Sequence, residues 1–171
     1  MRTFEEVYET LPADGWLSKA EAELLWYSVP LGCRALEVGC YQGRATVLIA
    51  ARAGSVACVD PFDGFHSDLS GPRIRERFAS NLRERGIGNV VLYPQRIEEW
   101  QPFPMDFAYL DGDHTYQGTI DQIKQALRCS PRSVAVHDVN DSGGGSEVKR
   151  AAMELLGGWS TRVERLAVWL C

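Results

Sequence analysis

The feature that most constrains the fold is the alternation of two kinds of pattern along the chain. Short, mostly apolar runs occupy residues 34–40, 55–61, 89–94, 105–112 and 133–139. Their length and their β-branched and aromatic residues are typical of buried parallel strands. Segments with apolar residues at helical spacing, such as Ile74, Phe78 and Leu82, separate them. This alternation predicts an α/β fold, a parallel sheet with helices on both faces.

The two ends of the chain extend this picture. A helix is expected over about 18–29, within a helical lead-in of residues 1–30, and Ser146 is the expected N-cap of the last helix. After Gly158, residues 159–171 form two strand-like pieces with no helix between them, so they should run antiparallel. We therefore expect a mostly parallel sheet with a reversed last strand, in a single domain spanning 1–171.

Composition and charge limit the class of protein. The net charge of −5 and the pI near 5.2 argue against a protein that coats nucleic acid or an anionic membrane. No apolar run approaches the length of a membrane span. Five cysteines without a CxxC pair indicate reduced thiols. We expect a cytoplasmic protein with no nucleic-acid or membrane partner.

Polar residues gather at one edge of the predicted sheet. In parallel α/β sheets, ligands bind beyond the carboxyl ends of the strands. The turns that follow the predicted strands, with the end of the fifth strand, hold all three histidines, His66, His114 and His137. The same turns are rich in aspartates: Asp60, Asp63, Asp68, Asp111, Asp113, Asp138 and Asp141. This edge is the candidate site.

The stretch "LEVGCYQG" (36–43) reads as a strand, a glycine turn and a helix start. Its E-x-G-x-x-x-G spacing lacks the Lys of a P-loop and the first glycine of a dinucleotide fingerprint, where Glu37 stands instead. A carboxylate there disfavours a pyrophosphate and suits a positively charged nucleoside. S-adenosylmethionine (SAM), with a sulfonium and an ammonium group, meets this requirement. Asp60, at the end of the second strand, is placed to bond ribose hydroxyls.

Four stretches together resemble a known family: "LEVGCYQGRATVLIA", "VDPFDGF", "YLDGDHTYQGTIDQI" and "VAVHDV". They are similar to class I SAM-dependent methyltransferases, and most similar to a small branch with D-G-x-H after strand four and H-D after strand five. The resemblance implies a Rossmann-like three-layer α/β/α sandwich with a seven-stranded sheet in the order 3-2-1-4-5-7-6. It also implies methylation of a small-molecule or sugar hydroxyl.

The resemblance also implies the residues of the cofactor site. Gly39 and the turn Cys40–Tyr41–Gln42 would contact the methionine end, Asp60 would hold the ribose, and Asp111 would face the methyl-transfer centre. The full expected set is Glu37, Gly39, Cys40, Tyr41, Gln42, Gly43, Asp60, Pro61, Phe62, Gln95, Arg96 and Asp111.

Two routes could activate the acceptor hydroxyl, and the sequence leaves both open. A divalent cation such as Mg²⁺ could bind the oxygen ligands Asp111, Asp138 and Asn140. Alternatively, a side chain could take the proton as a general base, with His114 the first candidate. The expected catalytic residues are Asp111, His114 and His137.

Two loops, 62–72 and 140–146, are expected to cover the acceptor. Because the site has few insertions, we expect a homo-oligomer whose partner subunit completes it. Two other functions stay open on the same fold class: a nicotinamide-dependent oxidoreductase and a SAM-binding module with reduced catalysis. A metal-dependent hydroxylase or hydrolase ranks lower because the sequence holds no compact HxD…H triad.

Overall fold

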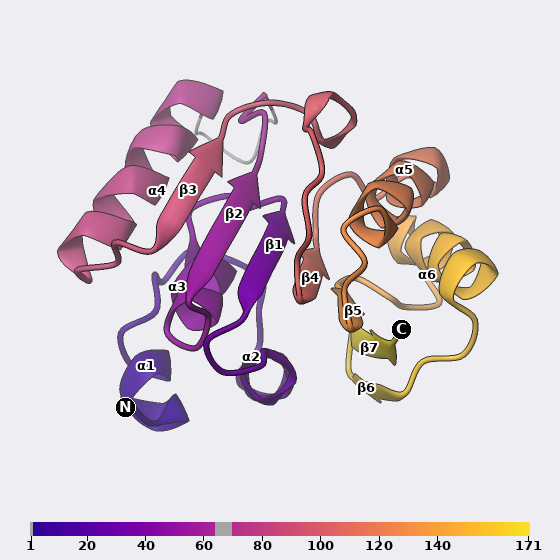
Figure 1. Cartoon of the computed structure of the whole chain (residues 1–171), viewed down its shortest axis with the longest axis horizontal. Helices are drawn as coiled ribbons and strands as arrows, with labels where there is room; N and C mark the ends of the chain where they lie inside the picture. The colour runs from indigo at the N-terminus through magenta and orange to yellow at the C-terminus, as the bar shows by residue number, and fades with distance from the viewer. Residues whose placement is uncertain (1, 64–69) are drawn as a thin grey trace.

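The computed structural model describes residues 2–63 and 70–171. Its central sheet has seven strands in the order β3-β2-β1-β4-β5-β7-β6, which confirms the predicted fold class and strand order (Figure 1). The strands are β1 (Arg34–Val38), β2 (Ser55–Val59), β3 (Val90–Tyr93), β4 (Phe107–Leu110), β5 (Ser133–Val136), β6 (Thr161–Val163) and β7 (Leu166–Leu170). The first five pair in parallel, and β7 runs antiparallel to both β5 and β6. The reversed strand thus lies between β5 and the edge strand β6.

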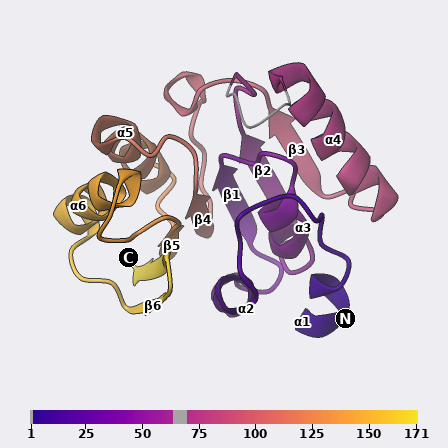
Figure 2. The same ribbon diagram turned by 180° about the vertical axis from the view of Figure 1, so that it is seen from behind.

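Helices cover both faces of the sheet, as Figures 1 and 2 show from opposite sides. They are α1 (Phe4–Tyr8), α2 (Lys19–Ser28), α3 (Arg44–Ala50), α4 (Gly71–Glu84), α5 (Tyr116–Leu127) and α6 (Gly144–Leu156), with a short 3₁₀ helix η1 (Ile97–Glu99). The helices α1 to α4 share one apolar cluster with sheet residues such as Cys58 and Phe107. On the other face, α5, α6 and η1 pack on residues such as Leu36 and Val134. Neighbouring strand residues alternate between these two clusters, because successive side chains of a strand point to opposite faces.

Some local expectations were wrong. The helix α6 starts earlier than predicted, with Gly143 as its N-cap, and Ser146 lies inside the first turn with its hydroxyl donating to the Gly143 carbonyl at 2.8 Å. The strand β5 ends at Val136, so His137 follows the strand rather than lying within it. The helix α1 and the 3₁₀ helix η1 were not predicted as separate elements, because segments this short carry little periodic signal. Among the described residues, no helix is long and apolar enough to cross a membrane.

Candidate active site

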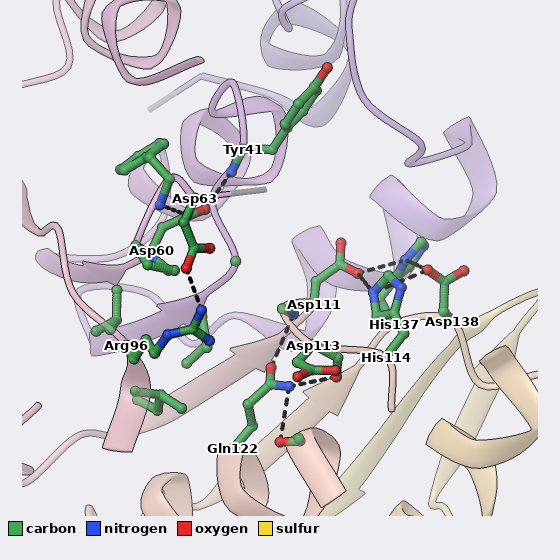
Figure 3. A pocket seen from close by; sticks show the side chains of 18 of the residues that line it. Tyr41, Asp60, Asp63, Arg96, Asp111, Asp113, His114, Gln122, His137 and Asp138 are labelled. Carbon is green, nitrogen blue, oxygen red and sulfur yellow. Dashed lines mark hydrogen bonds and ion pairs between the residues drawn. The ribbon is translucent and has the colours of Figure 1, made fainter. Parts of the chain in front are cut away.

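A cavity of about 550 Å³ opens at the carboxyl ends of β1, β2, β4 and β5, the edge that the sequence indicated (Figure 3). One end is lined by the glycine turn after β1 and the segment after β2, including Gly39, Tyr41 and Asp60. The other end is lined by residues that follow β4 and β5, including Asp111 and His137. The cavity therefore joins the two halves of the sheet at the point where the strand order reverses.

The first glycine of the turn, Gly39, leaves no room for a side chain, because another backbone segment lies against it. Gly39 has φ +83°, and a Cβ added there would lie 2.3 Å from the carbonyl oxygen of Asp111. The turn after β1 thus passes directly against the backbone that leaves β4. Gly43, with φ +88°, would place a Cβ 3.2 Å from a ring carbon of Phe78 on α4. Both glycines hold the turn in a left-handed conformation that other residues rarely adopt.

Asp60 binds this turn from the neighbouring strand. Its Oδ2 accepts hydrogen bonds from the backbone N–H groups of Cys40 at 2.7 Å and Tyr41 at 3.0 Å. Its Oδ1 accepts one from the N–H of Phe62 at 2.7 Å. Tyr41 and Phe62 both have positive φ, 46° and 51°. The carboxylate therefore stabilises two strained backbone positions at the cavity wall.

Glu37 lies beneath the turn rather than in the cavity. It is fully buried, and its Oε2 lies 3.4 Å from the Sγ of Cys58, which donates to it. Its Oε1 has no hydrogen-bond partner among the described residues. Burial, reinforced by the negative charges of Asp111 and Asp60, raises the pKa of Glu37 to about 8. The carboxyl group is therefore neutral at pH 7.

The other expected cofactor residues divide into two groups. Pro61, Phe62 and Arg96 line the cavity near Asp60, and Arg96 forms an ion pair with Asp63. The following residues do not line it: Glu37, Cys40, Gln42, Gly43 and Gln95. Three residues of this second group form the turn itself: Cys40, Gln42 and Gly43. The turn is tied to α4, because the carbonyl of Gln42 accepts a hydrogen bond from the side chain of Asn81 at 2.8 Å.

The far end of the cavity holds a cluster of carboxylates and imidazoles (Figure 3). The Oδ1 of Asp111 lies 3.3 Å from both His114 Nε2 and His137 Nδ1. The Oδ2 of Asp138 lies 3.5 Å from His114 Nε2 and 3.6 Å from His137 Nδ1. Asp138 also has φ 57° and is the third strained non-glycine residue at the cavity wall. The structure thus brings together the expected catalytic residues.

The carboxylates and imidazoles of this cluster shift one another's pKa values. Burial alone would raise the pKa of Asp111, but the neighbouring His137 and His114 outweigh it and hold that pKa below its usual value. Burial alone would lower the pKa of His137, but Asp111, Asp138 and Glu21 raise it to about 12. The hydrogen bond to Asp111 raises the pKa of His114 as well. His114 is 44% exposed in its side chain, so a ligand in the cavity could reach its imidazole.

Two of the three expected metal ligands, Asp111 and Asp138, line the cavity. Asp111 and Asp138 share a site with His114, in which one donor atom of each lies within 4.8 Å of the others. Asn140 does not line the cavity. Its Oδ1 accepts from the backbone N–H of Ser142 at 2.9 Å, and its side chain packs against Gly145. The third donor of the observed group is the imidazole nitrogen of His114.

Several residues of the site were missed by sequence reasoning. Glu21 on α2 contacts His137, and Arg165, in the turn between β6 and β7, donates to Asp138 Oδ1 at 2.8 Å. Trp16 lines the cavity and is 58% exposed, and Tyr109 donates its hydroxyl to Asp111 Oδ2 at 3.1 Å. Glu21 and Arg165 reach the site through long-range contacts that no local motif marks, whereas Tyr109 precedes Asp111 by two residues.

The two expected covering loops have different outcomes. Most of the first, including His66 and Asp68, lies outside the described residues. In the second, Gly144, Gly145 and Ser146 belong to α6, and none of residues 140–146 lines the cavity.

Comparison with known proteins gives the family. The profile of a family described as a methyltransferase domain matches residues 36–139. No sequence match was found among curated proteins.

Solved structures resemble the whole chain. An O-methyltransferase from Bacillus cereus, solved in complex with SAH, has a TM-score of 0.66 at 18% identity, covering 98% of this chain and 90% of that one. The O-methyltransferase TomG from Streptomyces achromogenes, involved in tomaymycin synthesis and solved in complex with SAM, has a TM-score of 0.67 at 18% identity, covering 98% and 88%. At this identity the structures show the shared fold, while the profile spans more than half of the chain. The chain therefore belongs to the methyltransferase domain family.

Proposed function

We propose that the protein is a SAM-dependent methyltransferase that methylates a hydroxyl group of a small-molecule or sugar acceptor. The observation that carries this proposal is a single cavity joining the glycine turn at one end to the histidine–carboxylate cluster at the other. Membership of the methyltransferase domain family supports methyl transfer over nicotinamide chemistry. The complexes of similar structures with SAM and SAH support the cofactor.

The cavity fits such a cofactor. Its volume of about 550 Å³ lies within the usual range for small-molecule sites. Gly39 and Tyr41 would contact the methionine end, Asp60 the ribose, and Phe62 and Arg96 the adenine. The expected residues that do not line the cavity, such as Glu37 and Gln42, would act by supporting the turn. The bound cofactor would supply an electrophilic methyl group.

The chain's own residues would prepare the acceptor. His114 is partly exposed at the cavity, so its imidazole would take the hydroxyl proton as a general base. Asp111, ionised and held by both histidines, would stabilise the imidazolium that forms. His137 is buried to 2% exposure and would act by holding Asp111 rather than by touching the acceptor. Holding the hydroxyl in line with the methyl group would make the transfer effectively unimolecular.

A divalent cation is the second route. Asp111, His114 and Asp138 would hold it, and a cation there would lower the pKa of the acceptor hydroxyl. Two carboxylates and one imidazole favour a transition ion over Mg²⁺, which prefers oxygen ligands. The two routes compete for His114, because a nitrogen bound to a cation cannot accept a proton.

The first experiment is titration calorimetry of the protein with SAM and SAH, each with and without Mg²⁺ or Mn²⁺. Micromolar binding that is lost in Asp60→Ala and kept in Asp121→Ala, a matched change on α5, would support the cofactor assignment. No binding of either ligand would refute the proposed function.

The second experiment measures SAH formation with a panel of phenols and sugars. Loss of turnover in His114→Ala with unchanged SAH affinity is expected for a general base. Gel filtration tests the expected homo-oligomer, which an elution volume at monomer mass would contradict.

A further inference from the structure

A third carboxylate, that of Glu21, reaches the cluster from the N-terminal part of the chain. Glu21 lies in the first turn of α2 and is fully buried. Its Oε2 accepts from the backbone N–H of Ser18 at 2.9 Å, and its Oε1 accepts from the backbone N–H of Arg165 at 3.0 Å. The same Oε2 lies 3.4 Å from the Nε2 of His137. Glu21 thus connects the start of α2, the turn between β6 and β7, and the imidazole next to Asp111.

The ring of His137 depends on this contact. Its Nδ1 faces Asp111 and Asp138 at 3.3 and 3.6 Å, and its Nε2 faces Glu21. Neither nitrogen has a well-aligned hydrogen bond among the described residues, although the ring is buried. A buried ring nitrogen without a partner is costly. Glu21 is the group in the described part of the chain that lies against Nε2.

We propose that Glu21 is a positioning residue that fixes the His137 ring with Nδ1 directed at Asp111. While Glu21 holds Nε2, the imidazole ring cannot rotate by half a turn without breaking the contact between Nδ1 and Asp111, the carboxylate that faces the cavity. The functional meaning of this arrangement rests on the proposed function, in which Asp111 lies at the methyl-transfer centre. The N-terminal helix α2 then belongs to the active site and not only to the scaffold.

A capping role alone does not explain the geometry. Glu at the third position of a helix can bond the N-cap backbone, and Gln serves there equally well. However, four donors converge on Glu21: the backbone N–H groups of Ser18 and Arg165, the Nε–H of Arg165 at 3.5 Å and the Nε2–H of His137. A carboxylate has two acceptor oxygens, whereas a Gln amide has one oxygen and an NH₂ group. Glu21→Gln can therefore keep the cap but must direct an NH₂ group at another donor.

The test is NMR of the protein labelled with ¹⁵N-histidine. The chain has three histidines, so His66→Asn and His114→Asn assign the ring signals. In the unsubstituted protein, we expect one set of His137 signals with an Nε2–H proton protected from exchange with water. In Glu21→Gln, we expect loss of that protected proton and a shift of both ring nitrogens. Glu21→Asp, which keeps the charge with a shorter reach, should restore the protected proton in part.

Controls separate positioning from general damage. Glu23→Gln makes the same chemical change at an exposed position of the same helix and should leave all three histidines unchanged. Unchanged His137 signals in folded Glu21→Gln would overturn the proposal. If Glu21→Gln does not fold, the spectrum of the unsubstituted protein still tests the proposal. Two sets of His137 signals, or an Nε2–H that exchanges rapidly with water, would overturn the proposal. Titration with SAH in the same samples tests the proposed function separately, since the ring signature does not require the cofactor.

Discussion

Replacing Glu37 by Gln tests whether a carboxyl group beneath the cofactor turn is neutral. Glu37 is fully buried, with Oε2 beside Cys58 and Oε1 without a hydrogen-bond partner among the described residues. Burial is the largest cause that raises its pKa, from 4.5 to about 8. Gln has nearly the same shape as a protonated Glu and does not titrate. The variant therefore removes the titration with little change in packing.

The sign of the effect follows from linkage. In the unfolded chain Glu37 loses its proton near pH 4.5, whereas in the folded protein it keeps the proton until pH 8. Between these values the unfolded state binds fewer protons, so the contribution of Glu37 to the free energy of unfolding falls as pH rises and levels off above pH 8. Each unit of pKa difference is worth about 1.4 kcal/mol, so this carboxyl group costs about 3 kcal/mol at pH 7 and about 4 kcal/mol at pH 8.

The assay is urea denaturation of both proteins at pH 5, 6, 7 and 8. The unfolding free energy of Glu37→Gln minus that of the unsubstituted protein should increase by about 3 to 4 kcal/mol from pH 5 to pH 8, in favour of the variant. Other titrating groups cancel in this difference to first order. Glu23→Gln, the same change at an exposed position of α2, is the control for the substitution itself. A constant difference for Glu37→Gln would refute the reasoning and show that Glu37 is ionised in the folded protein.

Three further substitutions test the architecture of the site. Gly39→Ala should lower the unfolding free energy by about 2 kcal/mol or more in urea denaturation, because it places alanine in a left-handed conformation against the Asp111 backbone. An unfolding free energy within about 0.5 kcal/mol of the unsubstituted protein, the usual range for surface changes, would contradict this packing. Asp60→Ala removes the acceptor of three backbone N–H groups, so the free energy of unfolding should fall by about 2 to 4 kcal/mol and calorimetry should show loss of SAH binding. Unchanged SAH affinity would show that the turn keeps its shape without Asp60. Arg165→Met removes the guanidinium that donates to Asp138 Oδ1 at 2.8 Å. Because the Arg165 side chain is partly exposed, the free energy of unfolding should fall by about 1 to 2 kcal/mol in urea denaturation. An equally stable variant would show that this ion pair does not stabilise the fold.

The sheet was predictable because its signal is local. Buried parallel strands are short apolar runs, and each observed strand from β1 to β5 lies inside the run that predicted it. The same reasoning placed Asp60, Asp111 and His137 at one edge, since each directly follows the end of its strand. The boundaries of α6 were less predictable, because a run of three glycines gives no indication of which residue begins the helix.

The partners of the site residues were not predictable from local pattern. Glu21 and Arg165 are 144 positions apart and meet because α2 packs beside the reversed end of the sheet. Asn140 is close to Asp138 in sequence, yet its side chain is used to close the turn before α6. The structure groups Asp111 and Asp138 with His114, from the turn after β4, whereas Asn140 does not line the cavity.

Three carboxyl groups at neighbouring strand ends show why residue type alone did not assign roles. Glu37 is enclosed without a cationic partner, so its pKa rises and it is neutral. Asp60 accepts three backbone N–H groups and shapes the turn. Asp111 lies between two imidazoles, so its pKa falls and it stays ionised at the cavity. The negative charge that a cationic ligand would meet therefore comes from Asp60 and Asp111, on either side of the turn, and not from Glu37, whose position in the motif first suggested it.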